Sequence, residues 1–141
     1  MRNTALNLLA RREHSSRELT KKLLSRNFSN DEIKQALATL QQQGLQSDKR
    51  FTEAYVRMRA NRGYGPFRIK LELEDRGVEA ELIDQCVDET DEVWQNHVME
   101  VWQKKFHALQ PETIEDYKKQ ADFLRYRGFT LKQINLLLKG R

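Results

Sequence analysis

Residues 69 to 87 read IKLELEDRGVEAELIDQCV and predict two helices joined by a tight turn. Apolar residues recur in this stretch at spacings of four and five, namely Ile69, Leu73, Val78, Ile83 and Val87. Spacings near four keep side chains on one face of a helix, so the row predicts the buried face of a helical hairpin. Arg76-Gly77 marks the turn, since glycine tolerates the left-handed conformation that ends many helices.

The same pattern occurs twice more along the chain. Fifty residues earlier the row is Leu19, Leu23, Phe28, Ile33 and Leu37, and fifty-one residues later it is Gln120, Leu124, Phe129, Ile134 and Leu138. The turns match as well, and they read Arg26-Asn27-Phe28, Arg76-Gly77-Val78 and Arg127-Gly128-Phe129. A period of this length indicates repeated structural units. The sequence therefore predicts an all-α protein of three tandem three-helix repeats, over residues 1–46, 47–90 and 91–141, forming an elongated, curved array.

Local signals predict where the helices begin and end. Ser15-x-x-Glu18 and Ser29-x-x-Glu32 are typical of capping boxes, and Ser47 or Asp48 is expected to cap the next helix. Gly63-Tyr64-Gly65-Pro66 is expected to end that helix and begin another. Further helices are predicted over about 78–89, 91–109, 112–127 and 130–139, the last opening with Thr130-x-x-Gln133. Phe28, Val78 and Phe129 are predicted to lie in the core.

Composition predicts a cytoplasmic protein without catalytic chemistry. Cys86 is the only cysteine, and there is neither a signal-peptide core nor an apolar run of about 20 residues. His14, His97 and His107 stand apart and are expected to be ordinary surface or half-buried histidines rather than metal ligands. Cys86 is expected to be a small core residue. We expect no cofactor, no metal and no enzymatic activity.

Charge is segregated along the chain, although the net charge is only +4. Residues 1–71 contain fifteen Lys/Arg and six Asp/Glu. Residues 72–100 contain one Lys/Arg and eleven Asp/Glu, and residues 101–141 contain nine Lys/Arg and four Asp/Glu. The acidic stretch is interpreted as a solvated face, with docking of a basic partner as the alternative. The basic stretch has the character of a surface that binds nucleic-acid phosphates with little sequence preference, but it could equally meet an acidic protein.

The loop Gly63-Tyr64-Gly65-Pro66 has two interpretations. Exposed amides at the start of a helix attract anions, and four cations flank the loop: Arg59, Arg62, Arg68 and Lys70. Phosphate binding is therefore one interpretation, and a plain turn between helices is the other. A nucleotide-hydrolysing loop is excluded because no Gly-Lys-Ser/Thr follows. Tyr55, Tyr64 and Phe67 could add stacking on single-stranded bases.

Three segments carry a recognisable set of residues. They are Leu8-Leu9-Ala10-Arg11-Arg12-Glu13-His14-Ser15 with Glu18-Leu19 and Lys22-Leu23, then Arg50-Phe51 with the stretch from Arg62 to Val78, and last Phe123 to Phe129 with Ile134. Together they resemble the bacterial regulatory protein RecX family. The resemblance implies tandem three-helix repeats that bind the helical RecA–DNA filament, inhibit strand exchange and the associated ATP hydrolysis, and bind DNA itself. Two departures from the family pattern are expected to matter. The sequence begins directly at the first predicted helix, whereas many relatives carry an N-terminal extension, and Gln46 stands where relatives usually have an apolar residue.

The predicted function is regulation of RecA by binding, and a non-specific nucleic-acid-binding protein of tandem helical modules is the alternative. The expected partners of the monomer are the RecA filament and, more weakly, single- or double-stranded DNA, with no membrane. The residues predicted to contact these partners are Arg59, Arg62, Gly63, Tyr64, Gly65, Arg68, Lys70, Arg76, Lys22, Arg26, Arg125 and Arg127.

Overall fold

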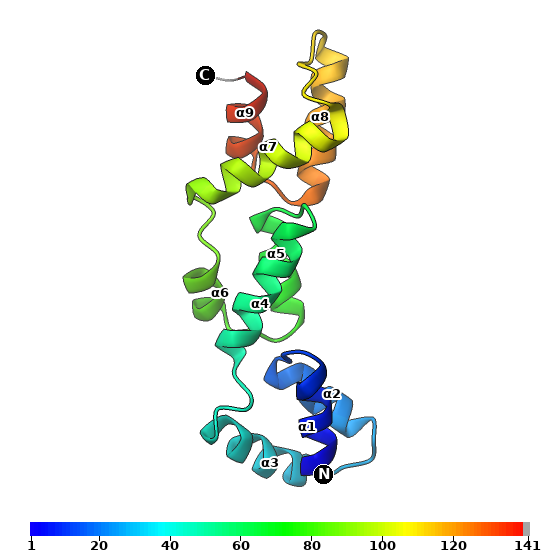
Figure 1. Cartoon of the computed structure of the whole chain (residues 1–141), viewed down its shortest axis with the longest axis vertical. Helices are drawn as coiled ribbons and strands as arrows, with labels where there is room; N and C mark the ends of the chain where they lie inside the picture. Colours follow the sequence, from blue (N-terminus) through cyan, green and yellow to red (C-terminus); the bar gives the residue numbers. More distant parts are fainter. Residues whose placement is uncertain (140–141) are drawn as a thin grey trace. The chain divides into compact units, whose positions relative to one another are not determined.

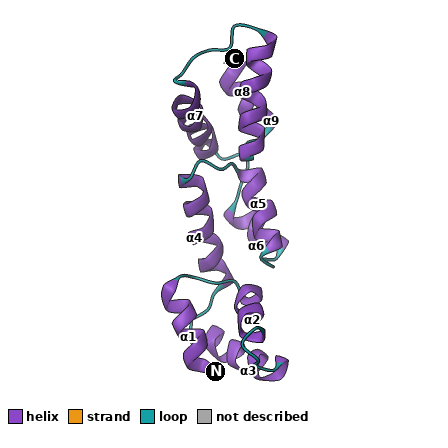
Figure 2. Cartoon of the chain, turned by 90° about the vertical axis from the view of Figure 1, so that its right-hand side faces the viewer, coloured by secondary structure: helices purple, strands orange, loops and turns teal. Residues whose placement is uncertain are grey.

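The computed structural model describes residues 1–139, and this part of the chain contains helices and no strand, as predicted (Figures 1 and 2). The helices of this part are α1 (Arg2–Arg11), α2 (Ser16–Leu24), α3 (Asn30–Gln42), α4 (Asp48–Asn61), α5 (Pro66–Asp75), α6 (Ala80–Cys86), α7 (Glu92–Phe106), α8 (Ile114–Arg127) and α9 (Leu131–Lys139). None of them is both long and apolar enough to cross a membrane.

The chain divides into two compact units. The first comprises residues 1–55 and 73–86, and the second comprises residues 56–72 and the described residues from 87 onward. Helices α4 and α5 therefore each contribute residues to both units. The division of the chain into three repeats at residues 46/47 and 90/91 stays a prediction.

Side-chain caps begin the helices where the sequence predicts them. The hydroxyl of Ser15 accepts a hydrogen bond from the amide of Glu18, whose carboxylate accepts one from the amide of Ser15. Ser29 and Glu32 form the same capping box at α3, and its hydrogen bonds lower the pKa of the Glu32 carboxyl. At the start of α9, the amide of Thr130 donates a hydrogen bond to the side chain of Gln133, and the amide of Gln133 donates one to the hydroxyl of Thr130. Each box satisfies amides that a helix start leaves without an intrahelical partner.

All three predicted left-handed turns are present. The φ angles of Asn27, Gly77 and Gly128 are 69°, 81° and 102°. In each turn the following apolar residue folds back over the helix: the amides of Phe28, Val78 and Phe129 donate to the carbonyls of Leu23, Leu73 and Leu124 over 3.3, 3.1 and 3.2 Å. Val78 and Phe129 are buried as predicted. Phe28 is only half-buried, which corrects its prediction as a core residue. It packs against the edge of the buried cluster formed by helices α1, α2 and α3, and the rest of its side chain is exposed to solvent.

Helix α6 is shorter than the predicted 78–89. Val78 belongs to the turn after Gly77, so the helix begins only at Ala80. It ends at Cys86, and Asp88 then forms a turn of its own by accepting hydrogen bonds from the amide and hydroxyl of Thr90. These two bonds lower the pKa of the Asp88 carboxyl, since they stabilise its charged form.

Two other predicted helix ends differ from the structure. Helix α7 ends at Phe106 rather than at residue 109, because His107 and Ala108 adopt left-handed φ angles of 54° and 61°. Helix α8 begins at Ile114, two residues later than predicted, and Thr113 caps it by accepting a hydrogen bond from the amide of Asp116. Boundaries set by such local turns shift without changing which face of a helix is apolar.

Each unit has a buried core that includes members of the predicted apolar rows. In the first unit, one cluster consists of Ala5, Leu8, Leu19, Leu23, Ile33 and Leu40. In the second unit, Leu124 and Ile134 are fully buried beside the polar member of their row, Gln120. The Gln120 side chain accepts a hydrogen bond from Nε1 of Trp102 and donates one to the carbonyl of Leu109, each 2.9 Å long. A buried amide is tolerated here because its donor and its acceptor are both bonded.

Candidate interaction site

Tyr64 and three of the predicted arginines form one cluster in the second unit. The guanidinium carbons of Arg59, Arg68 and Arg127 lie 3.8, 4.6 and 5.1 Å from the centre of the Tyr64 ring. Arg68 also lies 5.1 Å from the centre of the Tyr126 ring and donates a hydrogen bond to the Tyr126 carbonyl. Contacts between a cation and the face of an aromatic ring are attractive. The cluster therefore joins the end of α4 and the start of α5 to the last turn of α8.

One carboxylate binds two of these arginines. Glu72 accepts two hydrogen bonds from Arg59, of 2.9 and 2.8 Å, and one of 3.3 Å from Arg68. The side chains of Arg59 and Glu72 are only 14% and 18% exposed, so this bidentate pair is largely shielded from water. Lys70 is paired as well, with Glu89 at 3.5 Å. Three cations predicted to contact a partner are thus engaged within the protein.

The loop at residues 63–66 is a turn whose amides are occupied. The amides of residues 63 and 64 donate to carbonyls in the last turn of α4. The amides of Gly65 and Phe67 donate to the carbonyls of Arg127 and Gly128, over 2.7 and 2.9 Å. A Cβ atom on Gly65 would lie 2.4 Å from the carbonyl carbon of Gly128, so only glycine allows this approach. The structure supports the interpretation as a helix–helix turn, not as a set of free amides that bind an anion.

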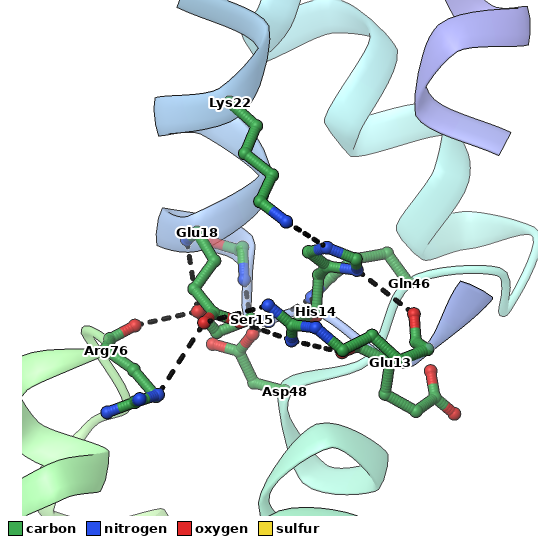
Figure 3. Close-up of polar contacts among 10 residues, drawn as sticks. Glu13, His14, Ser15, Glu18, Lys22, Gln46, Asp48 and Arg76 are labelled. Carbon is green, nitrogen blue, oxygen red and sulfur yellow. Dashed lines mark hydrogen bonds and ion pairs between the residues drawn. The ribbon is translucent and has the colours of Figure 1, made fainter. Parts of the chain in front are cut away.

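The first unit contains an equivalent junction (Figure 3). Ser15, at the start of α2, donates a hydrogen bond of 2.7 Å from its hydroxyl to the carbonyl of Arg76. A Cβ atom on Gly77 would lie 2.3 Å from Cδ of Arg17. In both units, therefore, the start of one hairpin's first helix docks onto the Arg-Gly turn of the next hairpin. Sequence reasoning missed this role, although the two turns that receive a helix carry glycine, whereas the remaining turn carries Asn27.

His14 is buried, which corrects the expectation of a surface or half-buried histidine. It is 1% exposed, with Nδ1 3.0 Å from the carbonyl of Arg12 and Nε2 3.1 Å from Nζ of Lys22 (Figure 3). A neutral ring that donates from Nδ1 and accepts at Nε2 satisfies both contacts. Burial lowers the pKa of His14, and the positive charges of Arg12 and Lys22 act in the same direction, against the hydrogen bond to the Arg12 carbonyl. His97 is half-buried and His107 exposed, as expected.

Gln46, one of the two departures from the family pattern, is buried beside His14. It is 2% exposed, and its Nε2 donates to the His14 carbonyl at 3.1 Å and to Oδ1 of Asp48 at 2.9 Å. Its Oε1 accepts a hydrogen bond of 2.9 Å from Gln41. The same Asp48 oxygen accepts the amide of Ser16 at 2.8 Å. The polar side chain is therefore fully bonded, and it fastens the segment before α4 to the start of α2.

A cationic groove of about 410 Å³ lies beside the junction of the first unit. Its lining residues come from α2 and from the end of α5, and they are Arg17, Glu18, Lys21, Lys22, Ser25, Asp75 and Arg76. The groove thus brings together two residues of the predicted contact set, Lys22 and Arg76. Nε of Arg76 lies 3.7 Å from the Glu18 carboxylate, and its guanidinium carbon lies 4.7 Å from the centre of the Tyr55 ring. Positive charge in a concave surface attracts polyanions.

The remaining predicted residues lie outside these clusters. Arg26, Arg62 and Arg125 are exposed. Among residues 1–139, no group of three or more His, Cys, Asp or Glu side chains is placed to hold a metal ion. Cys86 is half-buried, and burial raises the pKa of its thiol, which disfavours the reactive thiolate.

Helical hairpins that dock on one another through a recurring turn define a tandem helical-repeat protein. Three family models match the chain: the first RecX three-helix domain at residues 2–40, the second at 47–87 and the third at 91–138. The chain belongs to the RecX family of regulatory proteins.

Relatives cover the chain from end to end. The regulatory protein RecX of Pseudomonas entomophila strain L48 is 44% identical over 141 residues, which are 100% of this chain and 91% of that protein. The regulatory protein RecX of Pseudomonas putida strain KT2440 is 43% identical over 100% of this chain and 90% of its own length. The fold is similar to the crystal structure of RecX from Lactobacillus salivarius, with a TM-score of 0.81 and 24% identity over 99% of this chain and 92% of that one.

Proposed function

We propose that this chain regulates RecA by binding the RecA–DNA filament and inhibiting its recombinase and ATPase activities, with an auxiliary contact to DNA. The observation that carries the proposal is the full-length similarity to relatives named regulatory protein RecX. Regulation by binding relies on surface rather than on catalytic groups, and tandem repeats provide extended surface. The protein acts as a cytoplasmic monomer without enzymatic activity of its own.

The partner contacts are assigned to cations that face solvent. In the first unit these are the groove residues Arg17, Lys21 and Lys22, with Arg26 just after α2, and in the second unit they are Arg62 and Arg125. Exposed cations that lie together bind a polyanion with a strength that falls as salt rises. The paired arginines around Tyr64 contribute indirectly, because they fix the turn that carries Arg62.

DNA-dependent ATP hydrolysis by RecA is the direct test. Substoichiometric amounts of the wild-type protein should suppress it, and no suppression at several-fold excess would refute the proposal. The double variant Lys21→Gln with Arg26→Gln should weaken the inhibition. Its matched control is Lys34→Gln with Lys49→Gln, which removes two exposed cations of the same unit that are not among the assigned contact residues.

Non-specific nucleic-acid binding is the second candidate function, and the cationic groove is the observation that favours it. If non-specific DNA binding alone accounts for the inhibition of RecA, the chain competes with RecA for DNA, and an excess of DNA restores full ATP hydrolysis by RecA. Inhibition by filament binding persists when DNA is in excess. The salt dependence of DNA binding by the free chain gives the number of phosphates contacted, at roughly 0.7 to 0.9 units of log–log slope each.

A further inference from the structure

The second unit contains a cationic hollow that is separate from the Tyr64 cluster's paired arginines. It has a volume of about 280 Å³ and lies where the end of α4, the second half of α7 and the last turns of α8 meet. Its cations come from all three elements: Arg62 follows α4, Lys104 and Lys105 are in the last turn of α7, and Arg127 ends α8. None of the lysines was singled out by the sequence, because α7 reads as an ordinary amphipathic helix.

The four cations share the hollow with a single carboxylate, Glu100, and with His97. Among the described residues, none of the four forms an ion pair with an acidic side chain: Arg127 donates to the carbonyl of Arg62, and Lys105 lies over the Phe123 ring. Like charges held close together repel one another, and an anion bound between them relieves that repulsion. The hollow therefore offers its positive charge to a ligand rather than to a partner within the protein.

The apolar lining residues Val101 and Phe123, which we call the floor of the hollow, are held by packing. Phe123 packs edge-on against Phe106 with ring centres 5.6 Å apart, and the guanidinium of Arg127 lies 5.2 Å from the centre of the Phe123 ring. A Cβ atom on Gly63 would lie 3.1 Å from Nη1 of Arg127 and 3.2 Å from a methyl of Val101, so glycine lets the turn lie against both. The floor is thus held in place, whereas Arg62 and Lys104 are exposed to solvent.

We propose that this hollow binds one nucleotide unit of single-stranded DNA, with its phosphate held by Arg62 and Lys104 and its base or sugar lying against the floor of Phe123 and Val101. This combination of cations with an aromatic surface is the one that proteins use for single strands. A duplex keeps its bases paired and stacked, so only its outer phosphates could reach the rim. The inference rests on the DNA contact of the proposed function and assigns that contact to the residues of the hollow.

The test is the binding of a fluorescent oligothymidylate by the free full-length chain, without RecA, measured by anisotropy at several salt concentrations. The double variant Arg62→Gln with Lys104→Gln should weaken binding about tenfold or more and reduce the log–log salt slope by about 0.7, the contribution of one phosphate of a single strand. The matched control, Lys118→Gln with Lys119→Gln, removes two exposed cations of α8 that do not line the hollow and should retain the wild-type slope. Unchanged thermal unfolding of both variants shows that folding is intact.

Several results would overturn the inference. Equal losses in the two double variants would mean that only net charge matters. An equal loss for a duplex of the same length would remove the single-strand assignment. Competition by thymidine monophosphate or inorganic phosphate as strong as that of the oligonucleotide would identify a small phosphate compound as the ligand. Unchanged DNA binding with weakened binding to RecA would make the hollow a protein contact. Suppression of RecA hydrolysis by the wild-type chain is measured separately, so the proposed function can stand if the hollow fails, or fail if the hollow stands.

Discussion

The amide of Gly65 donates a hydrogen bond of 2.7 Å to the carbonyl of Arg127. This bond, with the one from Phe67 to Gly128, joins the start of α5 to the turn after α8. Ser15 and Arg76 make the corresponding bond in the first unit through a hydroxyl group instead of an amide. Each Arg-Gly turn therefore ends the helix that precedes it and also binds the start of a helix from the preceding hairpin. This is how hairpins that are separated in the sequence come into contact.

Gly128→Ala should destabilise the protein strongly. Gly128 has a φ of 102°, and a Cβ atom there would lie 2.3 Å from Cβ of Arg68 and 2.8 Å from its amide nitrogen. The cost should exceed about 3 kcal/mol in urea unfolding, because a left-handed alanine is strained and the two helices must also separate. Gly44→Ala is the control: its φ is 72° and no atom lies within 4 Å of the added carbon, so strain alone should cost about 1 kcal/mol. Equal losses would argue against the docking role of the turn.

Glu72→Gln should loosen the cluster around Tyr64. The substitution removes the negative charge that binds Arg59 and Arg68 at a site largely shielded from water. We expect a loss of about 1–2 kcal/mol in the free energy of unfolding, measured by urea denaturation at low salt. Glu74→Gln removes the same charge from an exposed neighbour on α5 and should cost less than about 0.5 kcal/mol. A Glu72→Gln variant as stable as the Glu74→Gln control would show that the pairs contribute nothing measurable.

Stability should fall as the pH is lowered below the ordinary pKa of histidine because His14 is buried. Its folded pKa is lowered from 6.5, so the unfolded chain binds the proton more readily than the folded one. The contribution of the neutral ring is complete above about pH 6.5 and is lost as the pH falls toward the folded pKa. Urea unfolding between about pH 7.5 and 5 should show a steeper loss for the wild type than for His14→Gln. Parallel curves would contradict the assignment.

The ring of His14 can also be followed directly. Its NMR titration midpoint should lie below 6.5, the value from which burial and the two neighbouring cations lower it. Lys22→Gln removes one of those cations, so it should move the midpoint upward. A midpoint that does not move would mean that Lys22 does not face the ring in solution.

Gln46→Leu should destabilise the first unit, although leucine resembles the apolar residue expected at this position in the family. Leucine cannot donate to the carbonyl of His14 or to Asp48, and it leaves the Gln41 amide without its acceptor. Leaving the buried carbonyl of His14 without this hydrogen bond should cost about 1–3 kcal/mol in urea unfolding. The same substitution in an Asp48→Ala background should cost less, because one of the lost bonds is already absent. Additive losses in the double variant would indicate that the two side chains act independently.

The sequence alone determined the elements that depend on neighbours a few residues away. The apolar rows at 19–37 and 69–87 fix which faces of the helices are buried, since helical periodicity places those side chains together. Ser15 with Glu18 and Ser29 with Glu32 fix helix starts for the same reason, because each capping box closes within four residues. The left-handed residues at 27, 77 and 128 followed from the tolerance of glycine and asparagine for that conformation. The caps, the left-handed residues and the row at 69–87 are confirmed, whereas in the row at 19–37 Phe28 and Leu37 are only half-buried.

Only the tertiary structure decided which cations are available to a partner. Arg59 and Arg68 look like part of a basic surface in the sequence, but Glu72 binds both of them. His14 looks like a surface residue beside two arginines, yet it is buried where Lys22 and Gln46 reach it. The hollow that contains Lys104 exists because α4, α7 and α8 converge there. Pairing, burial and concavity depend on residues distant in sequence, whereas a single sequence displays only local periodicity. The repeats are therefore visible in the sequence, but which of their charges face solvent is set by how the helices dock.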